Sequence, residues 1–353
     1  MTDLDDPAAL RAADPGGMLR AVTELPRHCR EGYALGRAAP GLPSAEGVTS
    51  LTFCGMGGSG IAGDVIGAVL DDRLPVPATV VRRAALPAHC GPDSLVLVSS
   101  YSGDTAETLS AFDEAVSRRC RVLAITSGGA LADRAAERGV ACLAVPSGFA
   151  MPRAAFGYLS LAPLGALETM GLAPELGADV DGAAVALERA LRSLGPEAPE
   201  SVNPAKSLAR RVGDRVPVIW GADGIAVVAA ARWKAQLNEN AKVPAFSSSL
   251  PELDHNEVVG WSEGRGRGFF LVVLRHGGEP PDVAARFPLS IEIARASGMD
   301  FEEIRAGDGP ALARLLELVL HGDLVATYLA LVRGVDPSPI EAIDRLKSAL
   351  AGA

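Results

Sequence analysis

Two loops rich in glycine and hydroxyl side chains are the parts of this sequence best suited to chemistry. The first, Gly55–Gly60 (GMGGSG), follows an apolar run and opens a helical pattern, and the second, Ser99–Thr108 (SSYSGDTAET), follows SLVLV and opens another. The N-terminus of a helix offers free N–H groups and a favourable dipole to an anion, and nearby hydroxyls add donors. The two loops together therefore predict a site for one phosphate group, formed by Gly58, Ser59, Ser100, Ser102 and Thr105.

The first loop also fits a different interpretation, because its glycines, beginning at Gly55, satisfy the dinucleotide-binding pattern GxGxxG. That pattern needs an acidic residue after the next strand to hold the ribose, but the next apolar run, PATVV, leads into Arg82 and Arg83. NAD is thereby disfavoured, while an NADP-dependent oxidoreductase stays open. Two plainer interpretations also remain. The glycines could serve only tight packing, and the hydroxyls could merely cap helices, which for Thr105 alone is the better interpretation.

The elements that must position these loops follow from an alternation of apolar runs and helical patterns. From Val48 the sequence alternates between apolar runs of strand length and helical segments, and a similar alternation starts again at Val216. This order is typical of parallel sheets covered by helices, in which the loops after the strands meet at one edge. The expected fold class is therefore α/β, with two doubly wound sandwich domains whose mainly parallel sheets are flanked by helices.

The predicted domain organisation has four parts. The segment SLGPEAPESVNP, near residue 200, is rich in Pro, Ser and Glu and indicates a linker. Apolar spacing at Ile340, Ile343, Leu346 and Leu350 predicts a C-terminal helix packed on the body. The parts are a helical arm (1–46), a first domain (47–175), a connecting helix and linker (176–203) and a second domain with the C-terminal helix (204–353).

Composition and charge argue against several other classes of protein. The chain has 353 residues, 48% of them apolar, so two domains of ordinary size are expected. A formal net charge of −10 disfavours nucleic acid as a partner, although a few local donors can still bind one phosphate. The five cysteines form no CxxC pair, the first residues are acidic, and no uninterrupted apolar stretch reaches membrane-spanning length. We therefore expect a cytoplasmic protein that contacts no membrane and no nucleic acid.

Six segments in a consistent order carry a resemblance to a known family. Besides the two loops, these are NPAKSLA, QLNENAK, ELDHNEVVG and DPSPIEAIDRLK. Together they resemble the bifunctional phosphoglucose/phosphomannose isomerase family of archaea and bacteria, from about Leu51 to Lys347. The resemblance implies two sugar isomerase (SIS) domains, a homodimer with active sites at the subunit interface, no metal and no cofactor. It also implies reversible conversion of glucose 6-phosphate or mannose 6-phosphate to fructose 6-phosphate.

The same resemblance implies the catalytic residues. Glu239 matches the catalytic base, Arg153 matches an arginine near the reacting carbons, His255 matches the ring-opening histidine and Lys347 matches a lysine that assists ring opening. The chemistry of the reaction also requires these residue types, independently of the family resemblance. Proton transfer between carbon 1 and carbon 2 requires a positioned base, and a permanently charged arginine stabilises the charge that develops on the oxygens. A histidine that titrates near neutral pH suits protonation of the ring oxygen.

Several alternatives stay open on the sequence alone. Asp254, His255 and Glu257 could suggest a metal, but this segment offers only one histidine, and we expect no metal. Without the resemblance, Glu239 would be interpreted as a solvated surface residue. A regulator that binds sugar phosphate without catalysis would need the two loops but not the four catalytic residues together. The preference for glucose or mannose phosphate is not readable, and Ser338 is only a loose candidate for setting it.

Overall fold

The computed structural model describes residues 2–351 and divides the chain into two compact units. The first unit contains residues 24–188 and 307–317, and the second contains residues 2–23, 189–306 and 318–351. Neither unit is one continuous stretch of chain, and α8 (Gly177–Leu194) and α14 (Ala311–Val332) each carry residues of both. The predicted boundaries after residues 46, 175 and 203 refer to continuous domains and remain a prediction.

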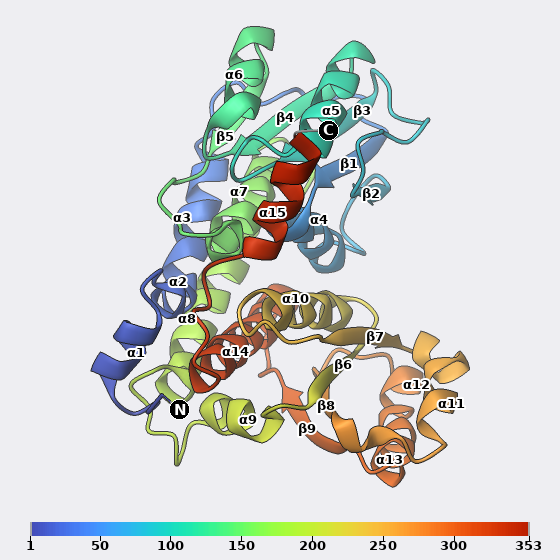
Figure 1. The fold of residues 1–353 in the computed structure, drawn as a ribbon. Helices are drawn as coiled ribbons and strands as arrows, with labels where there is room; N and C mark the ends of the chain where they lie inside the picture. The colour runs from blue at the N-terminus through green and yellow to red at the C-terminus, as the bar shows by residue number, and fades with distance from the viewer. Residues whose placement is uncertain (1, 352–353) are drawn as a thin grey trace. The chain divides into compact units, whose positions relative to one another are not determined.

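A five-stranded parallel sheet forms the centre of the first unit, with the strand order β2-β1-β3-β4-β5 (Figure 1). The neighbouring strands β1 and β3 are buried along their whole length, as expected for parallel strands covered on both faces. The strand order reverses its direction between these two strands, and such a point is where open α/β sheets bind ligands. The strands are β1 (Ser50–Gly55), β2 (Ala78–Val81), β3 (Ser94–Ser99), β4 (Arg121–Thr126) and β5 (Ala141–Ala144).

Helices cover this sheet, and the apolar side chains beneath them form its core. Phe112 of α5 is fully buried in one cluster with Val96 and Val98 of β3. Two further helices, α3 and α7, approach each other closely, since a Cβ on Gly36 would lie 1.9 Å from the carbonyl oxygen of Ala162. The helices of this unit are α3 (Leu25–Arg37), α4 (Gly57–Val69), α5 (Ala106–Ser117), α6 (Gly129–Arg138), the 3-10 helix η1 (Pro152–Ala155) and α7 (Phe156–Thr169).

The second unit contains a four-stranded parallel sheet with the order β7-β6-β8-β9. Its strands are β6 (Val216–Ala222), β7 (Phe246–Leu250), β8 (Phe269–Arg275) and β9 (Asp300–Arg305). Its helices are α1 (Pro7–Ala13), α2 (Met18–Thr23), α9 (Pro204–Val212), α10 (Ile225–Glu239), η2 (Glu252–His255), α11 (Glu257–Trp261), η3 (Gly266–Gly268), α12 (Pro281–Ala284), α13 (Phe287–Ala296) and α15 (Glu341–Ala351). Two parallel sheets flanked by helices confirm the predicted α/β fold class.

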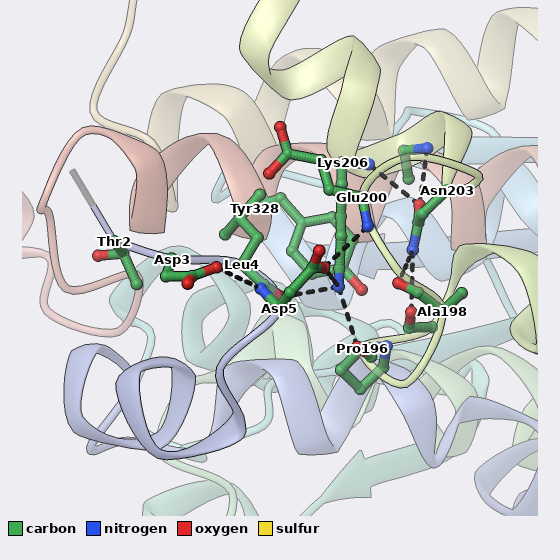
Figure 2. Close-up of polar contacts among 12 residues, drawn as sticks. Thr2, Asp3, Leu4, Asp5, Pro196, Ala198, Glu200, Asn203, Lys206 and Tyr328 are labelled. Atoms are coloured by element: carbon green, nitrogen blue, oxygen red, sulfur yellow. Dashed lines mark hydrogen bonds and ion pairs between the residues drawn. The ribbon is translucent and has the colours of Figure 1, made fainter.

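A buried lysine ties the N-terminal segment to the rest of the second unit (Figure 2). Lys206, in the segment NPAKSLA, is 0% exposed, and its Nζ donates to the carbonyl oxygens of Leu4 at 2.6 Å and Pro196 at 3.0 Å and to Asp5 Oδ1 at 3.0 Å. Asn203 caps α9 by accepting hydrogen bonds from two backbone N–H groups of its first turn. A buried ammonium is tolerated only when it is paired in this way. The segment NPAKSLA, which carries part of the family resemblance, therefore has a structural role in this unit.

Two helices near the C-terminus differ in how much of their apolar surface is covered. By length and composition α14 could cross a membrane, but 94% of its most apolar window is buried inside the protein. The predicted C-terminal helix exists as α15, yet Ile343 and Leu346 remain 38% and 60% exposed. The prediction that this helix packs on the body is therefore wrong for these side chains, because periodicity defines an apolar face but not what covers it. The side chain of Leu350 lies outside the described part.

His28 gives the first unit a stability that depends on pH. Its side chain is 1% exposed, and its ring lies 5.1 Å from the rings of Phe149 and Tyr158. Burial lowers the pKa of this imidazole, and the neighbouring Arg27 guanidinium acts in the same direction, so folding favours the neutral form. Because the unfolded chain has the ordinary pKa of 6.5, this contribution is fully present above that pH and is lost as the pH falls through the folded-state pKa.

We expect His28→Phe, which keeps the aromatic contacts but cannot be protonated, to lose less stability on acidification than the parent protein. Urea unfolding at about pH 7.5 and about pH 5 measures the free energy of unfolding on both sides of the ordinary histidine pKa. Equal losses in the two proteins would show that another group controls the acid sensitivity of this unit.

Candidate active site

The two predicted loops lie side by side at the carboxyl edge of the first sheet, because they follow the neighbouring parallel strands β1 and β3. A hydrogen bond joins them directly, from the backbone N–H of Tyr101 in the second loop to Ser59 Oγ in the first, at 3.1 Å. Each loop then opens a helix, α4 or α5, whose first N–H groups point out of the helix end. Hydroxyls, helix N-termini and strand order therefore coincide where this kind of sheet binds anionic ligands.

Close contacts require the glycines of the first loop. A Cβ on Gly60 would lie 2.6 Å from the carbonyl oxygen of Gly55, and a Cβ on Gly58 would lie 3.2 Å from the backbone N and Cα atoms of Arg153. Gly57 has a φ of +52°, in the left-handed region that favours glycine. Tight packing is thus one reason for these glycines, as the plainer interpretation held. The contact at Gly58 has a second consequence, since it places Arg153 directly beside the loop.

Hydrogen bonds within the second loop fix its hydroxyl groups. Ser100 Oγ lies 3.0 Å from Thr105 Oγ1 and accepts a hydrogen bond from the N–H of Gly103 at 3.1 Å. The exposed Ser102 accepts one through its Oγ from the N–H of Asp104 at 3.3 Å. Although Thr105 stands at the N-cap of α5, its side chain makes no capping hydrogen bond. The capping interpretation of Thr105 is therefore wrong, because its hydroxyl pairs with Ser100 instead.

Arg153 adds a positive charge to this group of side chains. It belongs to η1, the 3-10 helix that precedes α7, and only 3% of the residue is exposed. A guanidinium stays charged under all ordinary conditions, so a buried one must face acceptors or an anion. Of the residues predicted from the sequence, the first unit thus brings together Gly58, Ser59, Ser100, Ser102, Thr105 and Arg153.

Glu239 is the last residue of α10 and lines a pocket of about 780 Å³ in the second unit. Its neighbours build the turn after the helix. Asn238 Oδ1 accepts a hydrogen bond from the N–H of Ala245 at 2.9 Å, and the fully buried Asn240 places its Nδ2 3.5 Å from Thr327 Oγ1. The segment between α14 and α15 lines the same pocket and contributes Val335, Asp336, Pro339 and Ile340. A pocket of this volume suits a small molecule.

The other two predicted catalytic residues lie outside the lining of this pocket. His255 ends the 3-10 helix η2 and is exposed. Lys347 is also exposed and lies on α15, one helical turn after Ile343, the last of the pocket-lining residues. The structure therefore places Glu239 in a pocket but does not bring His255 or Lys347 to it.

Side chains that could suggest a metal or a nucleotide have partners within the protein. Asp254 Oδ1 accepts a hydrogen bond from Ser290 Oγ at 2.7 Å, while Glu257 accepts hydrogen bonds from the indole N–H groups of two tryptophans at 2.9 and 3.1 Å. Arg82, after β2, pairs with Asp64 of α4. Within residues 2–351, no group of three or more His, Cys, Asp or Glu side chains is placed to hold a metal ion.

Sequence reasoning missed Lys242 and the pocket wall formed by residues 335–343. The Lys242 ammonium donates a hydrogen bond to the carbonyl oxygen of Asp336 in that wall, at 3.1 Å. Both partners stand in or beside segments that carry the family resemblance, QLNENAK and DPSPIEAIDRLK. Nothing in their residue types indicates that the two segments meet, so only the structure reveals the contact.

Comparisons with known proteins identify a family for this chain. Residues 201–350 match the family described as the bacterial phospho-glucose isomerase C-terminal SIS domain. A bifunctional phosphoglucose/phosphomannose isomerase from Caldicellulosiruptor bescii is 34% identical over 95% of this chain and 99% of its own length. Another from Aquifex aeolicus is 37% identical over 85% of this chain and 90% of its own.

The fold has relatives among solved structures as well. The crystal structure of a glucose-6-phosphate isomerase like protein from Thermus thermophilus matches with a TM-score of 0.65 over 99% of each chain, at 20% sequence identity. At that identity the likeness establishes the fold. The sequence matches establish the family as well, because they are above 30% identity and cover 95% and 85% of the chain. The chain belongs to the bifunctional phosphoglucose/phosphomannose isomerase family.

Proposed function

We propose that this protein interconverts glucose 6-phosphate and mannose 6-phosphate with fructose 6-phosphate. The observation that carries the proposal is the position of Glu239, which lines a pocket of about 780 Å³ in a chain whose relatives are named phosphoglucose/phosphomannose isomerases. The reaction is an intramolecular oxidoreduction, because carbon 1 of the open-chain aldose is reduced while carbon 2 is oxidised. The relatives' names do not favour the alternative of a regulator that only binds the sugar phosphate.

The phosphate group is assigned to the two loops of the first unit. Gly58 and Ser59 belong to the first loop, and Ser100, Ser102 and Thr105 belong to the second. The support is the hydrogen bond that joins the loops, the position of both helix N-termini at one sheet edge, and the hydroxyl of Thr105, which caps no helix. Hydrogen bonds to a charged phosphate are stronger than those between neutral groups.

The steps on carbon are assigned to four further side chains. Glu239 removes the proton from carbon 2 of the open-chain aldose and returns it to carbon 1, while a proton moves between the two oxygens. Arg153 stabilises the enediolate between these transfers, since a fixed guanidinium favours the charge that develops on the oxygens. His255 protonates the ring oxygen when the sugar ring opens, and Lys347 assists that step.

The assembly and the compartment are also proposals. We propose a homodimer with active sites at the subunit interface, as the family resemblance implies. The exposed position of His255, outside the pocket that holds Glu239, supports this arrangement because it leaves the imidazole accessible to a neighbouring subunit. A cytoplasmic location fits a sugar phosphate substrate and a chain whose five cysteines are all free.

A coupled assay tests the function. The purified protein, treated with a chelator, is incubated with glucose 6-phosphate and separately with mannose 6-phosphate, and fructose 6-phosphate is measured as it forms. Turnover of both substrates is the expected result, and the ratio of the two kcat/KM values gives the preference that the sequence could not. Binding of the sugar phosphates without turnover of either would support the regulator instead.

Thr105→Val tests whether the Thr105 hydroxyl binds the phosphate group. Thr105 makes no capping bond but pairs with Ser100 Oγ, so we expect the free energy of unfolding to fall by about 1 kcal/mol, the value of one ordinary hydrogen bond. Loss of a hydrogen bond to a charged group, about 1.5–3 kcal/mol, should raise KM for the sugar phosphate roughly 10- to 100-fold. Ser117→Ala, which removes a hydroxyl from the far end of the same helix, is the control and should change neither value. An unchanged KM would show that the Thr105 hydroxyl does not bind the phosphate group.

A further inference from the structure

Lys242 combines an unusual backbone conformation with a side chain that meets three carbonyl oxygens. It follows α10 by three residues and has a φ of +55°, in the left-handed region that L side chains rarely adopt. Its Nζ donates hydrogen bonds to the backbone oxygens of Glu239 at 2.6 Å, Asp336 at 3.1 Å and Pro337 at 3.4 Å. The conformation and the contacts belong together, because the turn directs the ammonium back across the end of the helix.

The three acceptors come from two segments that line the pocket or adjoin its lining, the end of α10 and the segment between α14 and α15. The Glu239 oxygen is one of the last carbonyls of α10, which have no partner inside the helix, and a cation at a helix C-terminus is favoured by the helix dipole. The Asp336 and Pro337 oxygens belong to the segment between α14 and α15, whose neighbouring residues line the same pocket. One ammonium therefore bridges the helix that carries the carboxylate and the pocket wall formed by residues 335–343.

A left-handed backbone conformation destabilises the folded protein at a lysine but not at a glycine. The penalty is about 1–2 kcal/mol for a residue with a Cβ, and a short glycine turn would avoid it. Arg119 shows the same conformation, with a φ of +60° after α5, at the edge of the first sheet opposite the two loops. Among residues 2–351, Arg119 and Lys242 are the non-glycine residues with a positive φ, and of these two Lys242 contacts residues of the pocket.

We infer that Lys242 is a positioning residue, which fixes the Glu239 carboxylate relative to the pocket wall formed by residues 335–343. This inference rests on the proposed function, in which Glu239 moves the proton between carbons 1 and 2. Transfer between adjacent carbons requires one base to reach both, so a change in the position of the α10 end should slow the chemical step. The phosphate loops belong to the other unit, so substrate affinity should change little.

The test compares Lys242→Gly, which relieves the strain and removes the ammonium, with Lys242→Arg, which keeps a positive charge. For Lys242→Gly we expect kcat to fall about 10- to 100-fold, with KM within about twofold and thermal stability unchanged or higher. Lys242→Arg should recover part of kcat. Arg119→Gly is the matched control for strain relief and should raise stability without changing kcat. A Lys242→Gly protein with the parent kcat would overturn the inference, as would a fall in kcat that only follows a loss of stability.

A second measurement keeps this test separate from the proposed function. Hydrogen exchange of residues 335–343 reports the bridge directly and needs no substrate. Faster exchange there in Lys242→Gly, but not in Arg119→Gly, is the expected result, and unchanged exchange would remove the physical basis of the inference. If the parent protein turned over neither sugar phosphate, the proposed function would fail while the exchange result still decided whether Lys242 holds the two walls.

Discussion

Replacing Glu239 by Gln should lower kcat by about 10²- to 10⁴-fold for both glucose 6-phosphate and mannose 6-phosphate. The amide keeps the size and shape of the side chain at the end of α10 but cannot accept the proton from carbon 2. KM should change little, because the phosphate is assigned to the two loops of the first unit. Equal losses for the two substrates are expected, since one base would serve both epimers. Steady-state kinetics with the coupled assay measures each value.

The matched control for this variant is Glu292→Gln, which removes the same charge from an exposed position on α13 of the same unit. We expect it to retain the parent kcat and stability. Should Glu239→Gln turn over either substrate at the parent rate, Glu239 would not be the base. Another carboxylate would then have to transfer the proton.

The largest expected change in stability concerns a buried ion pair in the second unit. Arg232 of α10 donates to Asp323 of α14 through Nε at 2.9 Å and through Nη2 at 2.6 Å, and both side chains are 4% exposed. Asp323→Leu would leave a guanidinium buried without its carboxylate, and we expect a loss of about 3–5 kcal/mol in the free energy of unfolding. Urea denaturation of the purified proteins provides the measurement.

The double variant Arg232→Met with Asp323→Leu tests the reason for that loss. If the cost comes from an uncompensated charge, replacing both partners by apolar side chains should recover most of the stability. A double variant as unstable as Asp323→Leu alone would instead indicate that packing at Asp323 matters more than charge. The pair also joins the helix that ends in Glu239 to α14, so the same proteins can be assayed for kcat.

Much of the fold and one half of the candidate site could be predicted because their signals are local. Apolar runs bounded by glycine turns mark β1 and β3, and the residues that follow each strand are neighbours in sequence as well as in space. Adjacent parallel strands bring their loops to one edge whatever the rest of the chain does. Ser59, Ser100 and Thr105 could therefore be grouped before their hydrogen bonds were known.

The rest depends on contacts between distant segments, which residue types do not reveal. Glu239 reads as a surface glutamate at the end of a helix until the family resemblance assigns it a role. Lys242 meets Asp336 across 94 positions in the sequence, and its left-handed backbone has no signal in its residue type. For α15 the apolar spacing correctly predicted a helix. It did not predict how the helix packs, since Leu346 remains 60% exposed.

The hydrogen bonds of Lys206 restrict how this protein can be dissected. Residues 2–23 belong to the second unit, although the whole of residues 24–188 lies between them and the rest of that unit in the chain. A recombinant fragment that starts at residue 189 would lack the Leu4 and Asp5 acceptors and would leave a buried ammonium with fewer partners. Expression of the C-terminal half, or its exchange between relatives, should therefore carry the N-terminal segment along, fused or as a separate peptide.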